Sequence, residues 1–151
     1  FNFFGIFPNS LLICNISFSD NLKIVDGDTI KCDIDLGFST ILANQTIRLY
    51  GIDTPESRTR DKEEKYYGKL SASFLQDKCP KGSYITLITH LDKKGKFGRI
   101  LGEIIVDNVN LNQQMIEENL AVEYHGQSKS EIEKEHLYNR TQLNRRGFTF
   151  S

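Results

Sequence analysis

The sequence predicts an α+β fold in which a small antiparallel β-barrel is closed by helices. Short segments rich in Ile and Thr alternate apolar with polar residues between turn residues, which is the pattern of half-buried strands. One segment with apolar residues at helical spacing lies among these strands, and two helical segments follow them. The 151 residues, 38% hydrophobic and 26% charged, suit one domain with one core.

The first two strands are expected on either side of a tight bend. Residues 22–34 alternate in polarity around Asp26 and Gly27, so the chain should reverse direction there. Residues 35–45 predict a loop or a ragged hairpin.

The next strand, at residues 46–52, is expected to carry both core and functional side chains. Ile47 and Leu49 should point to one face, because successive side chains of a strand alternate. Arg48 and Tyr50 should then point together to the other face.

A helix is predicted after this strand. Pro55 ends the strand, and residues 57–65 form a charged loop. Residues 64–78 then predict a helix whose core-facing stripe comprises Tyr67, Leu70, Phe74 and Leu75.

Two more strands are predicted to form a hairpin. Residues 84–91 and 98–106 alternate in polarity, and residues 92–97 connect them.

The end of the chain predicts two helices. Asn110 can cap a helix over residues 111–118, and Asn119 tolerates the left-handed conformation needed where that helix stops. Ser130 to Glu133 has the spacing of a capping box, which predicts that the last helix begins at Ser130. Arg145, Arg146 and Gly147 suit its C-terminal end.

The beginning of the chain is expected to lie outside the domain. We expect residues 1–21 to be an N-terminal arm or the remnant of an export segment, and residues 22–151 to form the domain. No stretch is long and apolar enough to span a membrane. The three cysteines form no metal-binding pattern and predict unpaired thiols at Cys14, Cys32 and Cys79.

Three carboxylates are candidate metal ligands or catalytic groups. Asp28, Asp53 and Glu56 offer hard oxygen atoms of the kind that Ca²⁺ and Mg²⁺ prefer. A structural interpretation stays open for each, because Asp-Gly marks hairpins and residues 53–56 resemble a strand exit with a cap.

Two arginines are candidate anion-binding residues. The planar forks of Arg48 and Arg99 match two oxygens of a phosphate, although Arg48 has the alternative of pairing with a nearby acid. Lys93, Lys94 and Lys96 add a local basic face beside Arg99, or simply a solvated turn. The formal net charge of −1 gives no general attraction to nucleic acid.

Together these groups predict the hydrolysis of a phosphodiester. A cation and two arginines would neutralise the charge that develops on the phosphate in the transition state. A carboxylate such as Glu56 could orient or deprotonate the attacking water.

Five segments carry a resemblance to a known family. They occur in a specific order and spacing, and residues 22–124 as a whole are similar to the staphylococcal nuclease, or thermonuclease, family, in a form like its phage and marine bacterial members. The segments are residues 25–29, 47–56, 67–74, 96–99 and 109–121. The resemblance implies an OB-fold-like, five-stranded antiparallel β-barrel with three α-helices.

The resemblance also implies a role for each site residue. Asp28 and Asp53 would ligate Ca²⁺ through their carboxylates, and Thr54 would do so through its backbone carbonyl. Glu56 would hold the attacking water, and Arg48 and Arg99 would bind the scissile phosphate as catalytic groups. Substrate-binding roles would fall to Lys96, on a terminal phosphate, and to Tyr124, near the base-stacking position.

The activity implied is Ca²⁺-dependent hydrolysis of DNA and RNA with little sequence specificity. It cuts the 5′ P–O bond and leaves 3′-phosphates, on single strands by preference, and the protein would act as a monomer away from membranes. The alternative is a non-catalytic OB-type module that binds single-stranded nucleic acid without cutting it. The compartment stays open between secretion and a phage-encoded intracellular protein.

Overall fold

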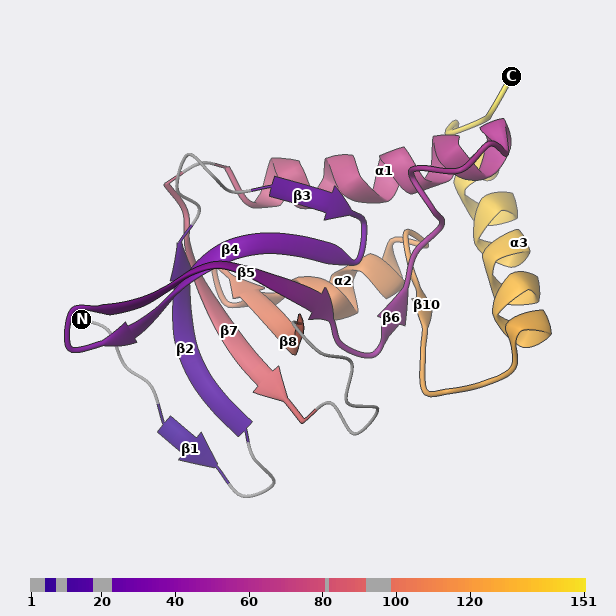
Figure 1. Cartoon of the computed structure of the whole chain (residues 1–151). Coiled ribbons are helices and arrows are strands. Elements are labelled where there is room, and N and C mark those ends of the chain that lie inside the picture. Colours follow the sequence, from indigo (N-terminus) through magenta and orange to yellow (C-terminus); the bar gives the residue numbers. More distant parts are fainter. Residues whose placement is uncertain (1–4, 8–10, 18–22, 81, 92–98) are drawn as a thin grey trace.

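The computed structural model describes residues 5–7, 11–17, 23–80, 82–91 and 99–151, and it has an α+β architecture (Figure 1). Its elements, in chain order, are β1 (Gly5–Phe7), β2 (Leu11–Ser17), β3 (Lys23–Asp26), β4 (Thr29–Gly37), β5 (Thr40–Leu49), β6 (Ile52–Asp53), α1 (Lys62–Lys78), β7 (Tyr84–His90), β8 (Arg99–Val106), β9 (Val109–Asn110), α2 (Leu111–Glu117), β10 (Val122–Glu123) and α3 (Lys129–Arg145).

Five of the strands close into a ring, which confirms the predicted barrel. Strand β2 pairs with β4 and β7, and the ring continues through β8 and β5 back to β4. The prediction of a wholly antiparallel barrel was wrong in one place, because β5 and β8 are parallel. Between them the chain passes through α1 and β7, and this long crossover lets β8 run in the same direction as β5.

The core lies inside this ring. Each ring strand contributes a side chain with no exposed surface: Ile16 from β2, Ile30 from β4, Ile47 from β5, Leu87 from β7 and Ile104 from β8. Aliphatic side chains at alternate positions pack well on the pleated inner face of a barrel. Residues 11–17 lie in the segment, residues 1–21, that was expected to be an arm or the remnant of an export segment. In the structure they form β2 and take part in the barrel.

The hairpin between β4 and β5 is longer and more regular than expected. Residues 35–45, predicted as a loop or a ragged hairpin, form the ends of two paired strands. The connecting residues, Phe38 and Ser39, both have positive φ, of 53° and 60°. Neither is the Asn or Gly that usually marks such a turn, so the sequence carries no clear signal for it.

The helices agree with the sequence except at two N-termini. Helix α1 begins at Lys62 rather than residue 64, because Asp61 accepts hydrogen bonds from the backbone of Glu63 and Glu64. Helix α3 begins at Lys129, and its capping box joins Ser128 to Glu131 rather than Ser130 to Glu133.

The cap and stop of α2 are as predicted. The Asn110 side chain accepts a hydrogen bond from the backbone of Gln113, and Asn119 has a φ of 60°. Figure 1 shows α1 running across the top of the barrel and α3 standing at its right, beyond β6 and β10.

The remaining structural predictions concern cysteines and membranes. Cys14, Cys32 and Cys79 are buried free thiols, as expected. None of the described helices combines the length and apolar character needed to cross a membrane.

Candidate active site

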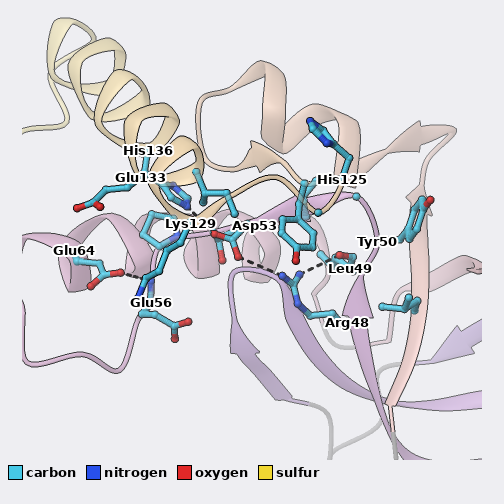
Figure 2. Close-up of a pocket in the computed structure, with 18 of the residues that line it drawn as sticks. Arg48, Leu49, Tyr50, Asp53, Glu56, Glu64, His125, Lys129, Glu133 and His136 are labelled. Atoms are coloured by element: carbon cyan, nitrogen blue, oxygen red, sulfur yellow. Dashed lines mark hydrogen bonds and ion pairs between the residues drawn. The ribbon is translucent and has the colours of Figure 1, made fainter. Parts of the chain in front are cut away.

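An open cleft of about 1250 Å³ lies beside the barrel, where β5, β6, β8 and α3 meet (Figure 2). Six of the eight candidate site residues line it: Arg48, Asp53, Thr54, Glu56, Arg99 and Tyr124. Lys96 falls outside the described residues, as does the predicted connection at residues 92–97. The eighth, Asp28, reaches the cleft through its contacts with the lining.

The position of Asp28 depends on the close packing of the β3–β4 turn. A Cβ atom added to Gly27 would lie 2.6 Å from the Cβ of Ser71 and 2.9 Å from the hydroxyl of Thr54. Only glycine therefore lets this turn pack directly against α1 and residue 54. The result is that the Asp28 carboxylate accepts a hydrogen bond of 3.1 Å from the backbone N–H of Thr54.

Asp28 and Asp53 converge on one guanidinium group. Nη2 of Arg48 lies 3.2 Å from Oδ2 of Asp28 and 3.5 Å from Oδ1 of Asp53. The side chains of Arg48 and Asp28 are 17% and 13% exposed, so both charges are largely removed from water and need this pairing. Arg48 thus pairs with acids, which was the alternative to phosphate binding that the sequence left open. These acids are the two candidate metal ligands.

His136 of α3 completes the surroundings of Asp53 (Figure 2). Its Nε2 atom lies 2.8 Å from Oδ2 of Asp53, and its side chain is only 13% exposed. An ionised carboxylate can only accept, so Nε2 carries the proton and donates this hydrogen bond. Asp53 itself is fixed by the pairing of β6 with β10, in which it lies opposite Val122.

Glu56 lies at the edge of the cleft on a loop held against α1. A Cβ atom on Gly68 would approach the Glu56 carbonyl to 2.6 Å, so this glycine also permits a close backbone contact. Partial burial of the carboxyl group raises the pKa of Glu56 above 4.5, and negative charge at Asp26, Asp28, Asp53 and Glu64 raises it further.

This cluster of carboxylates fits a divalent cation. Mutual repulsion among acidic groups is relieved by a bound positive charge, and carboxylate and carbonyl oxygens are the ligands that Ca²⁺ prefers. Among the described residues, no three His, Cys, Asp or Glu side chains form a metal-binding group by themselves. The expected set needs only Asp28, Asp53 and the Thr54 carbonyl, with water completing the coordination.

Two cleft residues on α3 were not foreseen from the sequence. His136 contacts Asp53, while Arg140 lies with its guanidinium 5.3 Å from the centre of the Tyr67 ring and 3.9 Å from Glu63. Both line the cleft. Their spacing of four residues, with buried Leu143 three residues further on, is a signal that one face of this helix packs inward.

Comparison with known proteins shows which family the sequence matches. The family described as staphylococcal nuclease homologue matches residues 46–147, which is more than half of the chain.

Individual relatives are similar at low identity. The chain is 28% identical over 108 residues to endonuclease YhcR of Bacillus subtilis (strain 168), a match that covers 68% of this chain and 8% of that protein. It is 29% identical over 99 residues to the thermonuclease of Staphylococcus intermedius, covering 66% and 55%. The chain thus spans about half the length of that thermonuclease. Because the family match covers more than half of its residues, the chain belongs to the staphylococcal nuclease family.

Proposed function

We propose that this protein is a Ca²⁺-dependent nuclease that hydrolyses phosphodiester bonds of DNA and RNA with little sequence specificity. One observation carries the proposal: Asp28 and Asp53 meet at the guanidinium of Arg48, in a cleft that also holds Glu56 and Arg99. Acidic oxygens for a cation and guanidinium groups for a phosphate therefore occur together. Similarity to an endonuclease and a thermonuclease supports nucleic acid as the substrate class.

Each residue has a role that follows from its chemistry. Asp28, Asp53 and the Thr54 carbonyl would hold Ca²⁺, which supplies positive charge to a phosphate oxygen. Arg48 and Arg99 bind the remaining phosphate oxygens and stabilise the charge that grows on them during attack.

Glu56 is proposed to orient the attacking water and to accept its proton. Water then adds to phosphorus, the bond to the 5′ oxygen breaks, and that oxygen leaves with a proton. The products are a 3′-phosphate and a 5′-hydroxyl. A raised pKa makes Glu56 a better proton acceptor than an ordinary carboxylate, provided that it is ionised at the working pH.

The substrate is proposed to be preferentially single-stranded and bound by a monomer. Tyr124 would contact a base and Lys96 a terminal phosphate. The backbone N–H of Tyr124 donates a 2.7 Å hydrogen bond to the Gly51 carbonyl, and this bond fixes the main chain of Tyr124 beside the strand exit that leads to Asp53.

The test is cleavage of a single-stranded DNA oligomer with Ca²⁺ or with a chelator. We expect cleavage only with Ca²⁺, and a loss of about 10²–10³ in rate for Glu56→Gln or Arg99→Ala. Glu117→Gln and Arg60→Ala, at exposed positions outside the cleft lining, are the matched controls and should retain full activity.

The outcome of this test separates the two functions that the family allows. Binding of the oligomer without any cleavage would support the non-catalytic module instead. Cleavage that persists in the chelator would contradict the role given to Ca²⁺.

A further inference from the structure

The proposed roles leave an aromatic side chain of the cleft, Tyr50, without a function. Tyr50 lines the cleft and is 44% exposed, although tyrosine is a large, partly apolar residue. Its ring stacks on that of His90, with the centroids 3.8 Å apart and the planes 6° from parallel. One face of Tyr50 is therefore covered by an imidazole, which leaves the opposite face for a ligand to stack on.

His90 is itself held from behind by a series of hydrogen bonds. Its Nε2 atom lies 2.7 Å from Oε2 of Glu103, whose other oxygen accepts a 2.9 Å hydrogen bond from the side-chain amide of Asn110. Asn110 also caps α2, so its position is fixed by that helix. The stacking partner of Tyr50 is thus held in place by residues outside the cleft lining.

The backbone of Tyr50 is fixed as well. Its N–H donates to the carbonyl of Gly102 at 2.8 Å, and its carbonyl accepts from the buried amide of Asn112 at 2.9 Å. A ring held at its backbone and on one face loses little conformational freedom when a ligand stacks on the other face, which favours binding.

The sheet places this ring pair near the arginine proposed to hold the phosphate. Arg48 lies opposite Leu101 of β8, and Leu101 lies opposite His90 of β7, so the three residues form one row across the sheet. Two strand spacings separate the ends of this row, roughly 10 Å. In Figure 2, Tyr50 stands on the far side of Arg48 from Glu56.

We propose that Tyr50, supported by His90, is a stacking platform for an unpaired base of the nucleic acid whose phosphate Arg48 holds. The proposal rests on the proposed function and adds a second base-binding position to it. Every nucleobase has a π-face, so an aromatic platform of this kind binds without sequence preference. A paired base within a duplex has no free face to offer, so the platform favours single strands.

The experiment compares two hexamers of equal charge, oligothymidylate and an abasic strand, at one fixed salt concentration. Dissociation constants are measured with the Glu56→Gln protein as background, so that the strand stays intact. Tyr50→Ala should weaken oligothymidylate binding about 5- to 150-fold, the range for loss of one stacked base. Binding of the abasic strand, which relies on phosphate contacts, should stay unchanged.

Matched variants control the comparison. Tyr50→Phe keeps the aromatic face and should bind like the parent, and Tyr50→Leu replaces the alanine variant if that protein folds poorly. Tyr138→Ala removes an even more exposed tyrosine that lies outside the cleft lining and should have no effect.

Equal binding of oligothymidylate by the Tyr50→Ala protein and its parent overturns the platform and leaves the proposed nuclease intact. Equal weakening for both strands also overturns it, because the effect would then not depend on bases. Failure of the unaltered protein to bind either strand overturns the proposed function and the platform together.

Discussion

At the scale of single residues, Asp53 is the centre of the candidate site. Two groups from different parts of the chain contact it, Arg48 at 3.5 Å and His136 at 2.8 Å. Arg48 brings a positive charge that competes with a cation for the oxygens of Asp28 and Asp53. His136 instead donates a hydrogen bond to one oxygen of Asp53. This hydrogen bond orients the carboxylate and leaves the other oxygen for a ligand.

The two contacts predict opposite changes in Ca²⁺ affinity, measured by calorimetric titration without substrate. Arg48→Gln should raise the affinity by about 5- to 30-fold, since an ion pair with a charged hydrogen bond is worth roughly 1–2 kcal/mol. His136→Leu should lower it by about 10- to 100-fold, the usual effect of removing a group that orients a metal ligand.

His136→Gln is the control for the orienting role, because it keeps an N–H donor and should recover most of the affinity. A fall in affinity for Arg48→Gln would show that the arginine helps rather than competes. Unchanged affinity for His136→Leu would remove the orienting role.

At the scale of elements, the position of Glu56 depends on how closely its loop packs on α1. Gly68 lies in the interior of this helix, where alanine would normally be more favourable by about 1 kcal/mol. The Cβ atom of an alanine would, however, lie 2.6 Å from the carbonyl carbon and oxygen of Glu56 and 2.7 Å from the Pro55 carbonyl oxygen. These are backbone atoms, so the loop that carries Glu56 would have to move.

We therefore expect Gly68→Ala to reduce both stability and turnover. Overpacking costs about 1–3 kcal/mol, which exceeds the gain in helix propensity, so the free energy of unfolding in urea should fall. Turnover should fall further than stability alone explains, because Glu56 is displaced. Ser73→Ala, at an exposed position of the same helix, should leave both quantities unchanged or slightly higher, and a Gly68→Ala protein that behaves in this way would contradict the packing argument.

The elements that sequence predicted well are those with a strong local signal. The apolar stripe of α1 and the Asn residues around α2 fixed these helices to within a few residues. The predicted start of α3 was wrong because Ser128 and Ser130 are each followed three residues later by a glutamate. The sequence therefore contains two possible capping boxes, and the local pattern favours neither. In the structure the box of Ser128 and Glu131 forms.

The charged residues of the candidate site could be picked out from their chemistry, but their convergence could be expected only through the resemblance to a family. Asp28 and Asp53 are 25 positions apart, and no local pattern states that the turn and the strand exit meet. The meeting of Asp28 and Asp53 depends on the packing of Gly27 against α1, which is a tertiary contact. His136 was missed for the same reason, since a lone histidine on a polar helix gives no sign of its partner.

At the scale of the whole molecule, the three buried thiols link stability to pH. Burial, together with the smaller effect of nearby Asp residues, raises the pKa of Cys32 from 9.0 to about 12 and that of Cys14 to about 11. Burial alone raises the pKa of Cys79 to about 12. The unfolded chain loses these protons near pH 9 while the folded protein still holds them, so the unfolded state binds fewer protons and stability falls as pH rises.

Cys32→Ala tests this link, because it removes one of the three groups from the core. Its free energy of unfolding should start lower at neutral pH, through the loss of packing, but should then decline less steeply between about pH 9 and pH 10.5. The parent is expected to lose about 1.5 kcal/mol more than the variant over this interval, the cost of keeping one thiol neutral. Parallel curves for the two proteins in urea titrations across this range would mean that Cys32 ionises as freely in the folded barrel as in the unfolded chain.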